Sequence, residues 1–166
     1  PTRRSSDLIT KENLTLLDIG CANGINVQNL VKLNPRIQAA GLDISPKMVE
    51  AAGKTGLYQD LFCQNLDDGL EVFENNTFDI VLALGCLEFM NKIDYCLMEI
   101  GRVCKPEGHL FASFQEFKEG EKFSPRQSYS GDVIHFGYSV EEVKQKLANS
   151  GYKVLKVEHQ EGYTGG

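Results

Sequence analysis

The stretch Leu16-Leu17-Asp18-Ile19-Gly20-Cys21-Ala22-Asn23-Gly24 decides the fold. It begins as an apolar run of strand length and continues into a turn of small residues. A helical pattern follows, with apolar side chains at Val27, Leu30 and Val31. Small residues let the backbone come close to a ligand, and the N–H groups at the start of a helix point toward it. The stretch therefore predicts a ligand site where the first strand ends.

The rest of the chain alternates strand and helix patterns, which is typical of a parallel sheet with helices on both faces. We expect strands at 14–19, 38–42, 61–66, 78–84, 109–117 and 152–158. Helices are expected at 25–33, 45–53, 93–103 and 139–150. Neither an internal repeat nor a linker is visible, so residues 9–166 are expected to form a single domain.

Composition excludes several classes of protein. Acidic residues outnumber basic ones by 23 to 17, and the sequence pI is about 5.1, so binding to nucleic acid phosphates is not expected. No apolar run reaches the roughly 18 residues of a membrane-spanning helix, so no membrane association is expected. The five cysteines contain no C-x-x-C pair, which favours reduced thiols in a cytoplasmic protein and no metal site.

The small-residue turn differs from a dinucleotide-binding turn. It reads G-x-A-x-G after Asp18, whereas a nicotinamide-dependent oxidoreductase uses three glycines to seat a pyrophosphate. A carboxylate before the first glycine repels phosphate and favours a cation. Asp43 ends the second strand and fits a carboxylate that accepts both hydroxyls of a ribose. Alone, an Asp at a strand end is more often a helix cap, but together with the small-residue turn the ribose role is favoured.

Four segments, 17–24, 41–48, 78–85 and 103–110, resemble motifs of the class I S-adenosylmethionine-dependent methyltransferases (methyltransferase type 11), in the family's order and spacing. Residues 42–61 also resemble the narrower group named after the Williams–Beuren critical region. The resemblance implies a Rossmann-like sheet of order 3-2-1-4-5-(7)-6 with helices on both faces. It also implies S-adenosylmethionine as the cofactor and in-line methyl transfer, which we expect to act on a small molecule. The alternative is a domain that binds S-adenosylmethionine or S-adenosylhomocysteine without turnover.

The resemblance also assigns the first motif to the methionine end of the cofactor. Asp18 would lie near the amino group. The backbone of four residues would line the methionine moiety, namely Gly20, Cys21, Ala22 and Gly24. Ala22 departs from the family pattern, because it replaces a glycine, and we expect this change to be mild.

Later segments would hold the rest of the cofactor. Asp43 would bind the ribose hydroxyls. The adenine would be bordered by Ile44 and Met48 and met at its edge by Asn65 and Leu66, and Leu84 and Gly85 would close the pocket under the sulfonium. Asn65 stands where the family often has Asp, so we expect weaker or altered affinity; the alternative is a plain turn residue.

No catalytic base follows from the sequence. The candidates after the fourth strand are Glu88 and Asn91, and those in the later loop are His135 and Tyr138. Each has an ordinary alternative: Glu88 fits a solvated or capping loop residue, and His135 fits a packing histidine. Proximity and orientation dominate methyl transfer, and a base is needed only for some acceptors.

Both ends of the chain read as cut. Residues 1–8 resemble a translated sequencing adapter, so we expect them to be non-native. The resemblance implies an N-terminal helical lid and a seventh strand between the fifth and sixth, and the chain has too few residues for either. We therefore expect a fragment; alternatively, residues 115–130 supply a substitute strand.

Overall fold

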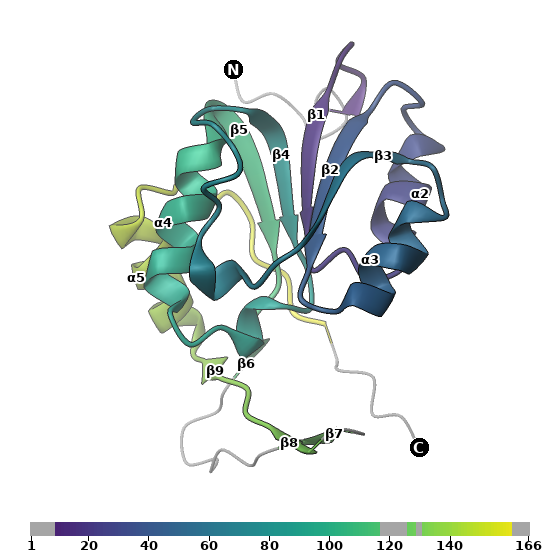
Figure 1. Cartoon of the computed structure of the whole chain (residues 1–166). Coiled ribbons are helices and arrows are strands. Elements are labelled where there is room, and N and C mark those ends of the chain that lie inside the picture. The colour runs from purple at the N-terminus through teal and green to yellow at the C-terminus, as the bar shows by residue number, and fades with distance from the viewer. Residues whose placement is uncertain (1–8, 117–125, 129–130, 161–166) are drawn as a thin grey trace.

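Figure 1 shows the computed structural model of the chain, which describes residues 9–116, 126–128 and 131–160. Five parallel strands form the central sheet in the order β3-β2-β1-β4-β5. They are β1 (Thr15–Ile19), β2 (Gln38–Asp43), β3 (Tyr58–Cys63), β4 (Phe78–Ala83) and β5 (Cys104–Ala112). The five-strand core of the expected order is confirmed. The expectation that residues 1–8 are non-native lies outside the described residues.

Helices cover both faces of the sheet, as the strand and helix alternation predicts. Helices α2 (Ile25–Val31) and α3 (Pro46–Gly53) lie on one side, and α4 (Ile93–Val103) and α5 (Val140–Asn149) lie on the other (Figure 1). Two buried apolar clusters match these layers. In β1, Leu16 packs in the cluster that contains Val27 of α2, whereas Leu17 packs in the cluster that contains Leu97 of α4. Successive residues of a strand point to opposite faces, so the sheet lies between two helical layers.

The apolar patterns of the sequence account for the central elements. All six residues of β4 are buried, which is what a strand covered on both faces requires. Helix α4 has the apolar residues Cys96, Leu97, Ile100 and Val103 at helical spacing, and all four are buried. Burial of this face against the sheet supplies most of the helix's stability in water.

The N-caps of α3 and α5 differ in their bonding. Ser139 and Glu142 form a complete capping box at α5: the Ser139 side chain accepts a hydrogen bond from the Glu142 N–H, and Glu142 Oε2 accepts one from the Ser139 N–H. Ser45 occupies the N-cap position of α3, with Pro46 at the first helical position, but its side chain makes no capping bond. The Ser45 N–H instead donates to Asp43 Oδ1 over 2.9 Å.

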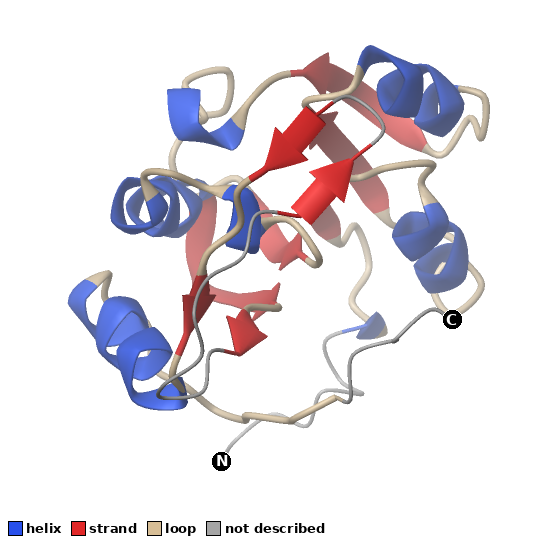
Figure 2. Cartoon of the chain, turned by 90° about the horizontal axis from the view of Figure 1, so that it is seen from below, coloured by secondary structure: helices blue, strands red, loops and turns tan. Residues whose placement is uncertain are grey.

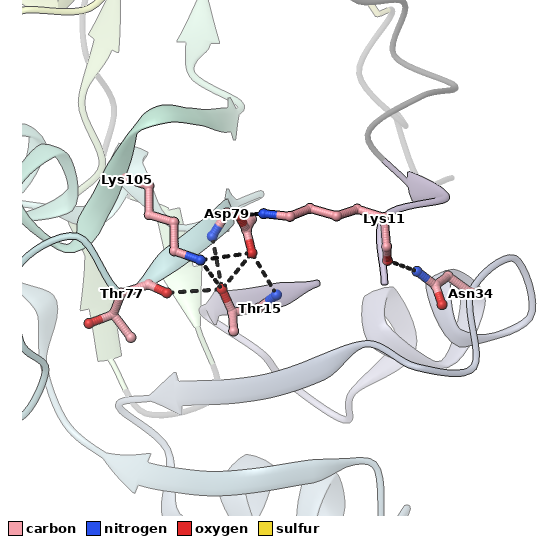
Figure 3. Close-up of polar contacts among 6 residues, drawn as sticks. All are labelled: Lys11, Thr15, Asn34, Thr77, Asp79 and Lys105. Carbon is pink, nitrogen blue, oxygen red and sulfur yellow. Dashed lines mark hydrogen bonds and ion pairs between the residues drawn. The ribbon is translucent and has the colours of Figure 1, made fainter. Parts of the chain in front are cut away.

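A buried carboxylate ties the amino ends of the central strands together (Figure 3). Asp79 accepts hydrogen bonds from the N–H of Thr15 over 3.1 Å and from its hydroxyl over 2.9 Å. Asp79 also pairs with Lys105, over 3.0 Å, and with Lys11. Lys11 is held in turn, because its carbonyl accepts a hydrogen bond from the Asn34 side chain. Burial alone would raise the pKa of Asp79, but the hydrogen bonds from Lys11, Thr15 and Lys105 hold it well below its usual range. This cluster lies at the amino ends of β1 and β4, far from the predicted ligand site.

The third strand is three residues earlier than expected. Its pairing with β2 places Leu42 opposite Phe62 and Asp43 opposite Cys63, and the chain then leaves the sheet. The apolar Leu66 enters the core from the short helix η1 (Leu66–Asp68) and not from a strand. A short apolar run does not reveal which of these two ways buries it.

The fifth strand also begins and ends earlier than expected. Residues 105–108, which precede the expected strand, lie inside β5. The ladder to β4 shifts register there: Phe78 pairs with Cys104, and Ile80 pairs with His109. The extra residues on β5 form an irregularity of the bulge type. The strand then ends at Ala112, so its predicted extension over 113–116 is wrong, and residue 117 lies outside the described residues.

No strand forms over the described residues 152–158, so the sixth strand expected there is a wrong prediction. The apolar side chains Val154, Leu155 and Val157 are 37%, 63% and 48% exposed. A strand is stabilised by ladder bonds to a neighbour and by a buried face. This segment has neither.

Two small sheets lie at the end of the molecule where the central strands finish. In one, β6 (Gln115–Glu116) pairs with β9 (Gly137–Tyr138); in the other, β7 (Arg126–Ser128) pairs with β8 (Gly131–Val133). Figure 2, seen from below, shows these strands lying across that end. The substitute strand considered for 115–130 falls partly outside the described residues, and its described parts do not join the central sheet. Among the helices that the structure describes, none has the length and apolar character needed to cross a membrane.

Candidate functional site

The predicted site residues come together at the carboxyl ends of β1, β2, β3 and β4, the lower end of the sheet in Figure 1. Open parallel sheets bind ligands in the crevice outside these ends. Four successive segments of the chain lie at this edge: the turn after β1, the turn into α3, the turn into η1 and the segment after β4.

The turn after β1 contains three residues with positive φ angles. Gly20, Ala22 and Gly24 have φ angles of +68°, +47° and +82°. The Gly20 and Cys21 N–H groups donate to the Leu42 carbonyl over 2.8 and 3.0 Å, which fixes the turn against β2. Ala22, which stands where the family pattern has a glycine, therefore lies at a position where glycine is unstrained. The backbone conformation of a non-glycine residue there costs about 1 kcal/mol or more. Strain of this kind marks a turn whose shape matters.

Asp43 joins this turn to the start of α3. Its Oδ2 accepts a hydrogen bond from the Ala22 N–H over 2.9 Å, and its Oδ1 accepts one from the Ser45 N–H over 2.9 Å. An ionised carboxylate has about four acceptor positions, so two remain for the hydroxyls of a ligand. The structure thus places Asp43 at the centre of the site with its acceptor capacity half used.

Open apolar surface lies beside Asp43. Ile44 is 66% exposed, Met48 is 40% exposed and Leu84, after β4, is also 40% exposed. Gly85 has a φ of +71°, and a methyl group added to it would meet nothing within 4 Å. The three side chains and the open space at Gly85 can accept the flat, apolar part of a ligand.

The turn after β3 places its two predicted residues differently. Asn65 is the N-cap of η1, where its Oδ1 accepts a hydrogen bond from the Asp67 N–H over 3.0 Å. The amide is therefore a turn residue in this structure, and an acceptor position on the same oxygen stays open. Leu66 is 2% exposed and its side chain packs in the core, so only its backbone is left to meet an adenine edge.

Asp18 is fully buried beneath the turn. Tyr58 donates a hydrogen bond to its Oδ2 over 2.7 Å, and Asn26 donates one to its Oδ1 over 3.4 Å. Burial raises the pKa of Asp18 and the two hydrogen bonds oppose that rise. Cys21 is buried as well, and burial together with the charges of Asp18 and Asp43 raises the pKa of its thiol to about 12. Cys21 is therefore a protonated packing residue and not a nucleophile.

The candidate catalytic bases lie near one another beyond β4. Glu88 belongs to the short helix η2 (Leu87–Phe89), and its carbonyl accepts a hydrogen bond from the Phe136 N–H over 2.6 Å. The rings of Phe89 and His135 are 6.0 Å apart. Tyr138 lies farther along the same segment, where its ring packs against Phe114 and burial raises the pKa of its hydroxyl. The structure thus brings the segment of Glu88 and the segment of His135 together beyond β4.

Two residues of the site were not singled out in the sequence. Tyr58 reaches Asp18 from β3, and no local pattern announces that contact. The second is Asp67, whose carboxylate accepts hydrogen bonds from the backbone N–H groups of Asn91 and Lys92. These bonds lower the pKa of Asp67 despite its burial and join η1 to the segment after η2. Asn91, another candidate catalytic base, donates a hydrogen bond from its side-chain amide to Asp67, which gives it a structural role.

The described ranges contain no group of three His, Cys, Asp or Glu side chains placed to hold a metal ion. The polar groups at this edge of the sheet are the carboxylate of Asp43, the backbone of the strained turn and the carboxyl group of Glu88 on η2. Such a set can bind a ribose and position an acceptor.

Gly20→Ala and Gly85→Ala form a matched pair that separates strain from crowding. The two φ angles are nearly equal, so the conformational cost is shared and is about 1 to 2 kcal/mol. A methyl group at Gly20 would lie 2.8 Å from Cys86 Cβ, whereas one at Gly85 would meet open space. We expect Gly20→Ala to be the less stable variant by a further 1 to 3 kcal/mol, roughly, in urea unfolding. Equal stabilities would show that Cys86 yields and that the turn is not tightly packed.

Comparison with known proteins identifies the family. Residues 17–112 match the methyltransferase domain family, type 11. A ubiquinone biosynthesis O-methyltransferase from Pelagibacter ubique is 30% identical over 109 residues, which is 65% of this chain and 44% of that protein. A mitochondrial arginine-hydroxylase from Mus musculus is 33% identical over 94 residues, 55% of this chain and 26% of that protein. The chain thus spans less than half the length of these relatives.

A solved structure agrees on the fold. The (4+2)-cyclase SpnF superposes with a TM-score of 0.72 at 26% identity, covering 91% of this chain and 57% of that one. None of these relatives bears the Williams–Beuren name, so the narrower placement stays a prediction. The family match covers more than half of the chain and includes the strained turn, Asp43 and all of β4. The chain belongs to the class I S-adenosylmethionine-dependent methyltransferase domain family.

Proposed function

We propose that this chain is the cofactor-binding part of an enzyme that transfers a methyl group from S-adenosylmethionine to a small molecule. The observation that carries the proposal is the carboxylate of Asp43, which joins the strained turn to α3 and keeps acceptor positions for the ribose hydroxyls. The apolar side chains of Ile44 and Met48 beside it are open to receive the adenine. The open space at Gly85 supports placing the methionine end of the cofactor beside it.

S-adenosylmethionine supplies an electrophilic methyl group when it is bound. The protein therefore has to hold an acceptor in line, exclude water and, for an acceptor hydroxyl, remove a proton. Glu88 is our candidate for the last task. Its Oε2 is buried and has no hydrogen-bond partner among the described residues, an arrangement that normally has a reason. Phe89 and His135 would form the adjacent wall of the acceptor site.

The relatives support a small acceptor. The Pelagibacter ubique protein is named for O-methylation in ubiquinone biosynthesis. The acidic composition of this chain also disfavours nucleic acid as the acceptor. We therefore propose an aromatic hydroxyl as the first acceptor to test.

A second candidate is a domain that binds the cofactor and transfers no methyl group. The fold is shared with a (4+2)-cyclase, and part of the sequence is similar to an arginine-hydroxylase, so the architecture hosts other chemistries. This candidate and the first one agree on cofactor binding and differ on turnover.

Calorimetry with S-adenosylmethionine and a transfer assay with methyl-labelled cofactor distinguish the two. We expect micromolar binding and label transfer to catechol-type hydroxyls. Binding without transfer to any acceptor, also in a chain extended to the length of its relatives, would favour the second candidate. Absence of binding in both chains would contradict both candidates.

Glu88→Gln tests the proposed base. We expect kcat for a hydroxyl acceptor to fall by roughly 100-fold or more, because the amide does not accept the proton. The Kd for S-adenosylmethionine should stay within about twofold, since Glu88 is placed on the acceptor side. Glu107→Gln, an exposed carboxylate in β5, is the control. An unchanged kcat in Glu88→Gln would remove Glu88 from the chemistry.

A further inference from the structure

Tyr58 is the first residue of β3 and lies at a break in the ladder between β3 and β2. Ala39 pairs with Tyr58 but Ala40 pairs with Asp60, so one extra residue, Gln59, is inserted into β3. Bulges of this kind bend a strand and redirect a side chain, and they are common beside functional sites. Here the side chain of Tyr58 is directed over β2 toward the turn after β1.

The Tyr58 ring lies against two glycines of the cofactor motifs. A methyl group on Gly41 of β2 would be 2.8 Å from ring atom Cε1, and one on Gly24, the N-cap of α2, would be 3.1 Å from Cε2. Both glycines therefore leave the space that the ring fills. The Tyr58 ring packs against the start of α2. A residue of β3 therefore contributes to the shape of the turn that follows β1.

The Tyr58 hydroxyl is hydrogen-bonded to the buried carboxylate of Asp18. It donates to Asp18 Oδ2 over 2.7 Å, while Asn26 donates to Oδ1 over the longer distance of 3.4 Å. Burial and the charge of Asp18 raise the pKa of Tyr58 far above its usual value, so the hydroxyl stays protonated and remains a donor. Tyr58 therefore gives Asp18 the shorter of its two hydrogen bonds.

The other ionisable groups near Asp18 do not stabilise its charge. Asp43 of β2 is acidic and acts to raise the pKa of Asp18. Cys21 in the turn and Cys86 after β4 are thiols whose pKa values are raised by burial and by the nearby carboxylates, so both are neutral. Without a cation among these neighbours, the ionised form of Asp18 depends on its two neutral donors.

We propose that Tyr58 is a positioning residue for the cofactor: it holds Asp18 oriented and ionised beneath the turn, where the negative charge favours the ammonium group at the methionine end. The proposal rests on the cofactor site assigned under the proposed function. Its consequence is a dependence on pH, because a neutral Asp18 no longer attracts the ammonium group. Affinity should be lost as the pH falls through the pKa of Asp18.

Tyr58→Phe keeps the ring and removes the hydroxyl. Loss of a hydrogen bond to a charged group raises the pKa of Asp18 by about one unit. The acid-side loss of affinity for S-adenosylhomocysteine should then begin about one pH unit higher, and below that point binding should be about tenfold weaker than in the wild type. 5′-Methylthioadenosine, which has no ammonium group, should bind both proteins within about twofold.

The experiment measures calorimetric Kd values for the two ligands between pH 5 and 8. Tyr152→Phe is the matched control: it loses a comparable part-buried hydroxyl, which donates to the Leu97 carbonyl on the opposite side of the sheet. It should leave both profiles unchanged. Equal weakening of the two ligands at every pH in Tyr58→Phe would overturn the proposal, because it would show a packing role alone.

Asp18→Asn gives a second test that does not depend on the folding of Tyr58→Phe. The amide keeps the shape and removes the charge, so S-adenosylhomocysteine should bind weakly without acid-side dependence, and 5′-methylthioadenosine should bind normally. Wild-type affinity for S-adenosylhomocysteine in Asp18→Asn would overturn the proposal. If the wild-type chain binds 5′-methylthioadenosine and Tyr58→Phe changes nothing, only the role of Tyr58 fails. If the wild type binds neither ligand, the cofactor site itself fails.

Discussion

Asp43→Ala is expected to weaken cofactor binding by more than about 1.5 kcal/mol, which is more than roughly tenfold in Kd. Two effects add. The ribose hydroxyls lose a charged acceptor, and bonds to a charged group are the stronger kind. In addition, the N–H groups of Ala22 and Ser45 lose the carboxylate that holds them, so the turn and the start of α3 are no longer joined.

Calorimetry with S-adenosylhomocysteine measures the first effect, and thermal unfolding of the unliganded protein measures the second. Asp43→Asn is the informative partner variant, because it keeps one acceptor oxygen and the size of the side chain. It should fall between the wild type and Asp43→Ala. Asp60→Ala removes an exposed carboxylate from neighbouring β3 and should change neither quantity. An unchanged Kd in Asp43→Ala would refute the ribose assignment.

The parts of this site that follow from sequence are local. The turn from 20 to 24 lies directly after a strand, and its small residues and spacing are visible without any partner. Asp43 is likewise placed by the end of its own strand. Because parallel strands finish at one edge, two such local features imply that they lie close together, and the bond from the Ala22 N–H to Asp43 bears this out.

The parts that do not follow from sequence depend on long-range contacts. Tyr58 and Asp18 are 40 residues apart, and their contact requires a bulge that hydrophobic periodicity does not reveal. Asp67 has the sequence context of a turn residue. Only the folded chain shows that its carboxylate accepts hydrogen bonds from the backbone of Asn91 and Lys92. The expected strand over 152–158 fails for a related reason: its pattern describes the segment, whereas a strand needs a neighbour.

Asp79→Asn is expected to destabilise the folded protein strongly. The wild-type carboxylate is 7% exposed and accepts from Thr15, Lys11 and Lys105. Its neutral replacement leaves two lysines without their counter-charge and retains a single acceptor oxygen. Breaking a buried pair costs about 3 to 5 kcal/mol, and the partial exposure of both lysines reduces this to about 2 to 3 kcal/mol in urea unfolding. Asp94→Asn, which breaks the exposed pair with Lys146, should cost less than about 1 kcal/mol.

The same carboxylate should make the stability depend on pH in one direction. The pKa of Asp79 in the folded protein lies well below its ordinary value of 3.8, because hydrogen bonds from Lys11, Thr15 and Lys105 outweigh its burial. The unfolded chain therefore takes up a proton first as the pH falls. The stabilisation is complete above about pH 5 and declines as the pH drops through 3.8 toward the folded-state pKa. The difference in unfolding free energy between wild type and Asp79→Asn should accordingly shrink below pH 4, while the difference for Asp94→Asn stays small throughout. A constant difference between pH 7 and pH 3 would mean that the cluster acts through packing and not through the charge of Asp79.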